Sequence, residues 1–196
     1  MTASPTPSGP DPTARPTGRD EVRAAVLAAA RRRLAAEGPS ASLRDIARDA
    51  GVNLGLLHRH FGSKDELIRA VFVANAQAGV ALVGEAPSFD AALERVLESF
   101  RGDDPTYARM LAWMLLSGRT PTELQSDFPT IARLVELGGD DARPVLLLVL
   151  LAMYGWQVFA DQLLVALGYA PGDKPAVLDE LTTILRRAAR SSTPEP

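Results

Sequence analysis

The chain has 196 residues, 46% of them hydrophobic and 23% charged, which is ordinary for one or two small globular domains. It contains no cysteine and two histidines, which excludes disulfides, zinc–thiolate sites and thiol nucleophiles and disfavours a histidine-rich metal site. The net charge of −3 is uneven, because residues 1–68 carry ten Lys or Arg and eight Asp or Glu, and the remainder carries eleven and sixteen. Any nucleic-acid site is therefore expected near the N-terminus. The first residues lack the apolar core of a signal peptide, which predicts a cytoplasmic protein.

The N-terminal segment divides into a tail and a helix. Residues 1–18 contain five prolines among small and polar residues and show no apolar periodicity, which predicts a disordered tail. The alanine-rich segment Arg19–Glu37 predicts a helix that Gly38 and Pro39 end. Its three consecutive arginines, at 31–33, are interpreted as a solvated helix face rather than a DNA contact.

Two short helices joined by a tight corner are predicted in Ser42–Phe61. Ser42 caps the first helix, whose apolar residues recur at spacings of three and four. Gly51 supplies the turn, because a sharp corner between helices often needs a positive φ. Asn53 caps the second helix, Leu54–Phe61. The pattern predicts a helix-turn-helix.

The remaining sequence predicts helices and no strand, so the predicted fold class is all-α. A capping box at Ser63–Glu66 opens a long helix, and another at 120–123 opens a segment that Pro129 splits into two short helices. Asp104 is predicted to cap a helix that has Pro105 at its first position. The other predicted helices are Ser88–Arg101, Pro105–Ser117, Ala142–Leu167 and Pro175–Arg190.

One of these helices is apolar enough to raise the question of a membrane span. The segment from Pro144 to Ala160 has no charged residue and is nearly long enough to cross a bilayer. Arg143 and Asp161 bracket it, Gln157 lies within it, and no second such stretch exists. We therefore favour a helix buried on all sides in a soluble bundle over a membrane span.

The sequence from Leu43 to Leu67 resembles the TetR family of bacterial regulators. That family's pattern has an Ile-Ala pair, then Ala-Gly-Val, a polar cap, a glycine, a Leu-Tyr pair, a His-Phe pair and a lysine three positions on. The resemblance extends over about residues 20–75. In two departures, His58 replaces the usual tyrosine and Arg33 stands where an apolar residue is commoner. The matching residues are Ile46, Ala47, Ala50, Gly51, Val52, Asn53, Gly55, Leu57, His60, Phe61 and Lys64.

The resemblance implies a homodimeric, non-enzymatic transcription regulator that needs no cofactor. It implies a DNA-binding domain at 19–65 and a ligand-binding and dimerisation domain at 66–196. The partner would be double-stranded operator DNA of pseudo-palindromic sequence, since a two-fold dimer presents two identical recognition helices. The helix at 54–61 would enter the major groove, while helix N-termini and cations hold phosphates. The implied DNA-binding residues are Ser42, Leu43, Arg44, Asn53, Leu54, Gly55, Leu56, His58, His60 and Lys64.

Several of these residues have a second interpretation. Leu54 and Leu56 either contact thymine methyl groups or pack in the core. His58 either contacts a base or is a packed aromatic substitute for the tyrosine. Arg44 and Lys64 are either phosphate contacts or solvated charges.

The later helices suit the two tasks that the family gives them. Ala142–Leu167 is apolar around its circumference and Pro175–Arg190 carries an apolar stripe, which together predict a four-helix dimer interface. The alternative is that both are buried within one protomer. Large apolar side chains near one or two polar groups predict a pocket for a small apolar effector, with ordinary core packing as the alternative for each. The candidate ligand-binding residues are Tyr107, Met110, Trp113, Met114, Met153, Trp156, Gln157 and Phe159.

Three functions are compatible with this sequence. A ligand-responsive regulator, acting as a repressor that an apolar molecule releases from its operator, is favoured. An all-α small-molecule-binding protein or enzyme that happens to contain this corner is disfavoured. No carboxylate pair, nucleophile–base arrangement or glycine-rich phosphate loop is present, and the acids at 103–104 and 140–141 are explained as helix caps. An architectural DNA-binding protein without an effector is the third. In the favoured interpretation, the helix Lys64–Val83 transmits the ligand signal by changing the separation of the two recognition helices.

Overall fold

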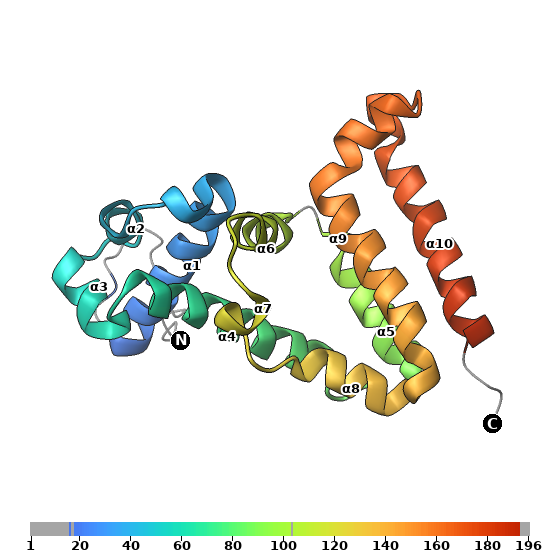
Figure 1. The fold of residues 1–196 in the computed structure, drawn as a ribbon, viewed down its shortest axis with the longest axis horizontal. Coiled ribbons are helices and arrows are strands. Elements are labelled where there is room, and N and C mark those ends of the chain that lie inside the picture. The colour runs from blue at the N-terminus through green and yellow to red at the C-terminus, as the bar shows by residue number, and fades with distance from the viewer. Residues whose placement is uncertain (1–15, 17, 103, 193–196) are drawn as a thin grey trace, which may run out of the picture.

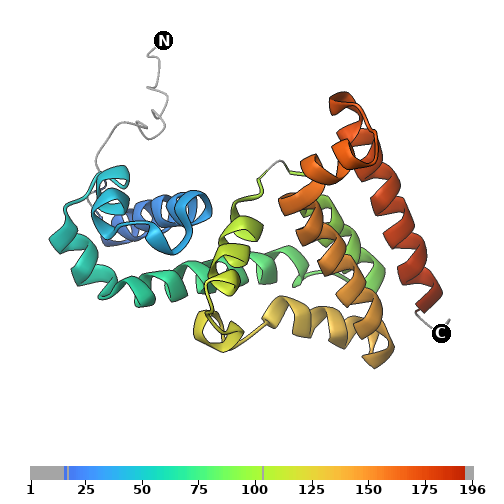
Figure 2. The same ribbon diagram turned by 45° about the horizontal axis from the view of Figure 1, so that its top comes forward.

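The computed structural model describes residues 16, 18–102 and 104–192, and these residues form helices and no strand (Figures 1 and 2). The predicted all-α fold class is therefore confirmed. Apart from residues 16 and 18, the predicted tail lies outside the described residues. The α-helices are α1 (Arg19–Glu37), α2 (Leu43–Asp49), α3 (Leu54–Phe61), α4 (Lys64–Val83), α5 (Phe89–Ser99), α6 (Thr106–Leu116), α7 (Pro121–Leu124), α8 (Pro129–Gly138), α9 (Arg143–Ala166) and α10 (Lys174–Ser192).

The helices enclose two hydrophobic cores, and α4 runs from one to the other (Figure 1). The first core lies among α1, α2, α3 and the first half of α4, and it includes the fully buried Leu34, Ile46 and Leu57. The second lies among the end of α4 and α5, α8, α9 and α10. Helix α6 packs along α1, buries Met110 and Met114 in the first core, and also contacts α9 of the second. The two cores are therefore linked by α6 as well as by α4.

The helices of the predicted corner begin where the sequence places them, because a side chain caps each start. Ser42 Oγ accepts a hydrogen bond from Asp45 N at 3.1 Å, and Asn53 Oδ1 accepts one from Leu56 N at 2.8 Å. Between them, Gly51 has a φ of 69°, a conformation that residues with a side chain rarely adopt. These contacts are local, so the angle at which α3 leaves α2 depends on residues within the corner itself.

The capping box at the start of α4 is also present, whereas the start of α6 differs from the prediction. Ser63 N donates to Glu66 Oε2 at 2.7 Å, and Ser63 Oγ accepts from Glu66 N at 3.2 Å. Pro105 is the N-cap of α6 and not its first residue. Asp104 Oδ1 nevertheless accepts from Thr106 N at 3.0 Å, which is the bond expected of the predicted capping side chain, so only the first helical residue differs, by one position.

Helix α9 departs most from the sequence prediction, which buries it on all sides. One face packs in the second core, but the opposite face is exposed, and Leu151 there is 64% exposed. The prediction is wrong for a single chain, because too few helices surround α9 to cover it. By length and composition alone, Lys64–Val83 and Asp140–Ala166 are long and apolar enough to cross a membrane, a test that core helices also pass. The exposed apolar residues of α9 are Leu147, Leu148, Leu151, Phe159, Leu163 and Val165.

Candidate nucleic-acid interface and cavity

Helix α3 has one buried face and one accessible face. Leu57 is fully buried and Phe61 is 7% exposed, so these two residues anchor the helix in the first core. Gly55 is exposed, and Leu54 is half-buried without belonging to that core. Leu56 is also half-buried, but it packs against the core. The accessible face of α3 therefore offers a small surface around Leu54 and Gly55, with Leu56 at its edge.

The two histidines of the chain lie on α3 in different surroundings. His58 is exposed, and its Nδ1 lies 2.8 Å from Gly62 O. A carbonyl oxygen can only accept, so Nδ1 must carry the proton, and Nε2 remains for another partner. His60 is half-buried, with its ring centre 6.4 Å from that of Phe61. The His58 ring thus closes the C-terminal end of α3 and is not packed in the core.

The predicted phosphate contacts at the starts of α2 and α3 are partly occupied by capping. Ser42 Oγ donates to Asp45 Oδ2 at 2.6 Å, so its single proton is already engaged. Leu43 is half-buried against the first core, whereas Arg44 is exposed. The side chain of Asn53 is exposed and uses its oxygen as the cap, which leaves its amide NH₂ group to donate. Arg44 and Asn53 are therefore the groups best placed to meet a phosphate.

Lys64 has an internal partner that the sequence did not indicate. Its Nζ donates to Pro39 O at 2.5 Å, which ties the first turn of α4 to the loop after α1. Burial, and next the nearby charge of Arg119, lowers the pKa of Lys64. An ammonium group has three protons, so this bond leaves two donors for a further contact. Lys64 is thus a partly buried group that braces α4, and it is not a freely solvated charge.

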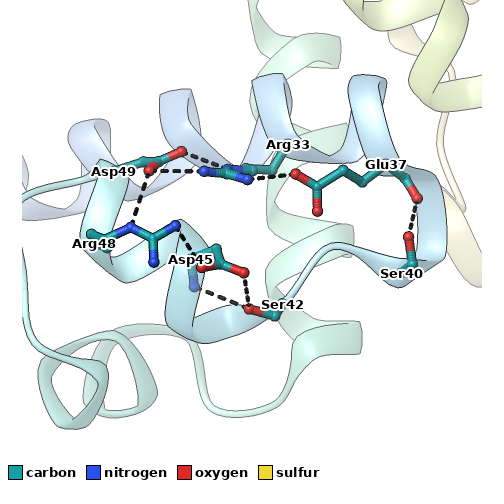
Figure 3. A network of polar contacts seen from close by, with 7 residues as sticks. All are labelled: Arg33, Glu37, Ser40, Ser42, Asp45, Arg48 and Asp49. Atoms are coloured by element: carbon teal, nitrogen blue, oxygen red, sulfur yellow. Dashed lines mark hydrogen bonds and ion pairs between the residues drawn. The ribbon is translucent and has the colours of Figure 1, made fainter.

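A polar network joins α1 to α2 and explains the unusual Arg33 (Figure 3). Arg33 Nε and Nη2 donate to the two carboxylate oxygens of Asp49, at 2.6 and 3.1 Å. Arg33 Nη1 donates to Glu37 Oε1 at 2.5 Å, and Arg48 Nη2 lies 2.6 Å from Asp45 Oδ1. The interpretation of Arg33 as a solvated residue is therefore wrong. It fixes the C-terminal end of α2 to α1 with a two-bond ion pair.

Replacing Arg33 by Met is expected to lower the melting temperature modestly at pH 7, and by less in acid. The hydrogen bonds from Arg33 hold the pKa of the Asp49 carboxyl below its ordinary value of 3.8. A carboxyl whose pKa is lowered by folding stabilises the fold fully above 3.8, and this contribution is lost as the pH falls through its lowered value. Thermal melts of both proteins between pH 7 and pH 3 measure the difference. In an Asp49→Asn background, the Arg33→Met effect should be smaller, because only the bond to Glu37 remains, and an undiminished effect there would contradict the assignment.

A cavity of about 400 Å³ is lined by α1, α4, α5, α6, α8 and α9 and by the loop before α8. Of the predicted ligand residues, Tyr107 and Gln157 line it. Arg31 and Asp104 are the charged side chains among the described residues of its wall. Nowhere in the described part of the chain do three or more His, Asp or Glu side chains group as metal ligands would. The described part of the cavity wall is thus mainly apolar, with one cation and one carboxylate.

The other six predicted ligand residues do not line the cavity. The three methionines are fully buried in the two cores. Trp113 is 48% exposed and covers Gly38, where an added Cβ would lie 2.9 Å from its ring, and Phe159 is 57% exposed. Helical spacing alone does not tell which side of α6 or α9 faces this cavity, and the predicted set includes residues from other sides of both helices. The six residues are Met110, Trp113, Met114, Met153, Trp156 and Phe159.

Small residues of α4 make room for the cavity, and the sequence analysis did not identify them. Ala76, Ala78 and Gly79 line it. A Cβ at Gly79 would clash with the hydroxyl of Thr130, so α4 and α8 approach closely at this point. The signal in the sequence is the alanine- and glycine-rich run at 74–79, in which Ala76 and Gly79 are three positions apart and so leave one side of a helix without bulk.

Comparison with known proteins identifies the family. Residues 26–71 match the family model described as bacterial regulatory proteins, tetR family. The chain is 38% identical over 178 residues to the HTH-type transcriptional repressor Rv3405c of Mycobacterium tuberculosis, an alignment that covers 85% of this chain and 84% of the relative. The HTH-type transcriptional regulator Mb3439c of Mycobacterium bovis matches with the same identity and coverage. The solved structure of Salmonella enterica GusR has a similar fold, with a TM-score of 0.63 and 19% identity over 88% of this chain and 95% of that one. The chain therefore belongs to the tetR family of bacterial regulatory proteins.

Proposed function

We propose that the chain is a transcriptional repressor that binds a pseudo-palindromic operator in double-stranded DNA as a homodimer and is released by a small apolar effector. The observation that carries the proposal is the capped corner between α2 and α3, which holds the accessible face of α3 on a packed three-helix core. Family membership and the similarity to a transcriptional repressor of M. tuberculosis support repression. Residues 19–65 form the DNA-binding domain in this proposal and 66–196 the ligand-binding and dimerisation domain. The protein acts in the cytoplasm, without a cofactor.

In this proposal α3 lies in the major groove with its accessible face toward the bases. Leu54 and the accessible part of Leu56 contact thymine methyl groups, and Gly55 allows the helix backbone to approach the bases closely. His58 reaches a base through Nε2, because its Nδ1 is held by Gly62 O. The remaining groups contact the sugar–phosphate backbone, which positions the protein without reading sequence. The proposed backbone contacts are Ser42, Leu43, Arg44, Asn53, His60 and Lys64.

Replacing Lys64 by Ala is expected to weaken binding to all DNA sequences and to reduce the salt dependence. A lysine on a phosphate displaces counterions, so its loss should reduce the slope of log affinity against log salt by about 1. The slope separates this role from the internal bond to Pro39 O, since a loosened α4 lowers affinity at every salt concentration alike. Fluorescence anisotropy on one duplex at several salt concentrations measures it. An unchanged slope would show that Lys64 is an internal brace alone.

The homodimer is proposed to form through residues 142–167 and 175–190. Helix α9 exposes an apolar face, and the neighbouring α10 also exposes an apolar residue, Ile184, which is 61% exposed. Helices α9 and α10 pack side by side, so two copies of this pair can form a four-helix interface about a two-fold axis (Figure 1). Monomeric proteins rarely expose an apolar patch of this extent, which supports a second copy as its cover.

The effector is proposed to occupy the cavity and to act through α4. Tyr107 and Gln157 belong to its wall, as do small residues of α4. The same helix begins directly after the DNA-binding corner, so a shift of α4 changes the separation of the two recognition helices. These must match successive major grooves about 34–36 Å apart, and a coupling of about 1–3 kcal/mol is enough to alter operator occupancy.

A gel-shift titration on the DNA upstream of the chain's own gene, with and without apolar compounds, tests this function. If the protein binds this DNA at nanomolar concentration and an apolar compound weakens the binding, the result supports a ligand-responsive regulator. Absence of specific binding would contradict DNA recognition. Binding that no compound in a broad apolar collection weakens would favour an architectural protein without an effector.

A further inference from the structure

Arg31 on α1 is an incompletely paired cation at the wall of the cavity. Its Nη2 donates to Asp104 Oδ2 at 2.9 Å, and both residues line the cavity. Its Nε is buried and has no hydrogen-bond partner, the single such side-chain nitrogen or oxygen among the described residues. A buried donor without a partner is unfavourable, because it has lost its hydrogen bond to water without gaining one in the protein. The ion pair is therefore incomplete on the side of the guanidinium that bears Nε and Nη2.

Two other arginines of the chain show which kind of partner binds the Nε and Nη2 donors together. Arg33 binds both oxygens of Asp49 through Nε and Nη2. Arg186 binds both oxygens of Glu94 in the same way, at 2.8 and 2.6 Å. A carboxylate matches this pair of donors in one plane, and two parallel bonds are stronger than one.

Asp104 cannot complete the pair with Arg31, because its second oxygen has another task. Asp104 Oδ1 accepts from Thr106 N and starts α6. Hydrogen bonding by Thr106 is also the main reason why the pKa of the Asp104 carboxyl is lowered, with Arg31 a smaller cause. Thr106 therefore stabilises the Asp104 carboxylate more than Arg31 does. Arg31 can change partner while Asp104 still caps α6.

The rest of the wall suits an aromatic body with an oxygen acceptor. The ring centres of Tyr107 and Tyr154 are 6.0 Å apart, and those of Phe100 and Tyr154 are 5.4 Å apart. Burial raises the pKa of Tyr107 and that of Tyr154, so both hydroxyls stay protonated and can donate. A cavity of about 400 Å³ holds one or two rings.

We propose that the ligand of this cavity is an aromatic carboxylate, whose carboxylate replaces Asp104 on the Nε and Nη2 atoms of Arg31. The identification of this ligand as the effector rests on the proposed function. Arg31 lies on the helix whose Arg33 holds α2, so the exchange of partner removes an ion pair between α1 and the residue before α6, while the apolar packing of α6 on α1 remains.

Calorimetric titration of the full chain with 2-naphthoate and its uncharged counterpart 2-naphthamide tests the proposal. The wild type should bind naphthoate at least about tenfold more tightly than naphthamide, because only the carboxylate makes two charge-assisted bonds with Arg31. Arg31→Met should abolish this preference, and Arg31→Lys should reduce it, since an ammonium lacks the paired donors. Asp104→Asn keeps an oxygen for Thr106 N but removes the competing charge, so it should strengthen naphthoate binding and leave naphthamide within about twofold. Arg32→Met, an exposed neighbour outside the wall, is the matched control.

Melting temperatures identify the variants that remain folded. Equal affinity of the wild type for the two probes, no naphthoate binding at millimolar concentration, or an undiminished preference in folded Arg31→Met or Arg31→Lys protein would overturn the proposal. These titrations contain no DNA, so they are independent of the operator. A chain that prefers naphthoate but binds no DNA would overturn the proposed function alone, and one that binds DNA without this preference would overturn the ligand assignment alone.

Discussion

The Gly55→Glu variant is expected to fold normally and to lose specific DNA binding by about a hundredfold or more, since like charges across an interface cost several kcal/mol. Gly55 is exposed, its φ is not in the left-handed region, and an added Cβ would meet only Asn53 Oδ1, at 3.4 Å. A carboxylate at this point of α3 would face the polyanion in the proposed complex. Anisotropy titration against one duplex measures the loss.

The matched control for this variant is Ala132→Glu, which makes the same charge change at an exposed position of α8, remote from the corner. It should bind DNA as the wild type does, apart from a small effect of net charge. Circular dichroism and thermal melts should place both variants close to the wild type. Undiminished DNA affinity in Gly55→Glu would show that α3 does not enter the groove.

The Leu151→Glu variant is expected to be a folded monomer at micromolar concentration. Leu151 is 64% exposed in the single chain, so its replacement removes little from either core. In the proposed dimer it is covered, and a buried carboxylate without a partner costs several kcal/mol, which raises the dimer dissociation constant by about a thousandfold or more. Sedimentation equilibrium measures the mass directly.

The same variant should bind the operator weakly, because a monomer brings one recognition helix to a two-part site. Ala132→Glu again serves as the control and should remain dimeric. A Leu151→Glu protein that stays dimeric at micromolar concentration would place the interface elsewhere and leave the exposed face of α9 unexplained.

The DNA-binding corner could be predicted from the sequence because its determinants are local. Ser42 and Asn53 each bond to a backbone group three residues ahead, and Gly51 needs no partner to adopt its turn. The role of Arg33 could not be predicted in this way. Its carboxylate partner Asp49 lies sixteen residues away on another helix, so the sequence shows only an unexpected charge.

The cavity could not be located because it depends on how separate helices meet. The spacing of α6 predicts an apolar stripe, but it does not tell whether Met110 and Met114 face the cavity or the first core. The cavity exists instead because α4 carries small residues where it lines the space, such as Ala76 and Gly79. Likewise, the sequence shows that α9 is apolar all round. That part of this surface is exposed within one chain can be known only once the number of helices packed around α9 is known.

Selection of bound sequences from a library of random duplexes shows whether this chain recognises an operator through paired α3 helices. Wild-type protein should enrich two inverted half-sites whose centres are about one helical turn, 34–36 Å, or a multiple of it apart. Sedimentation should find two chains per duplex, and Gly55→Glu should enrich no sequence. Enrichment of a single half-site by one chain, enrichment of the same site by Gly55→Glu, or no enriched sequence at all would contradict recognition through paired α3 helices.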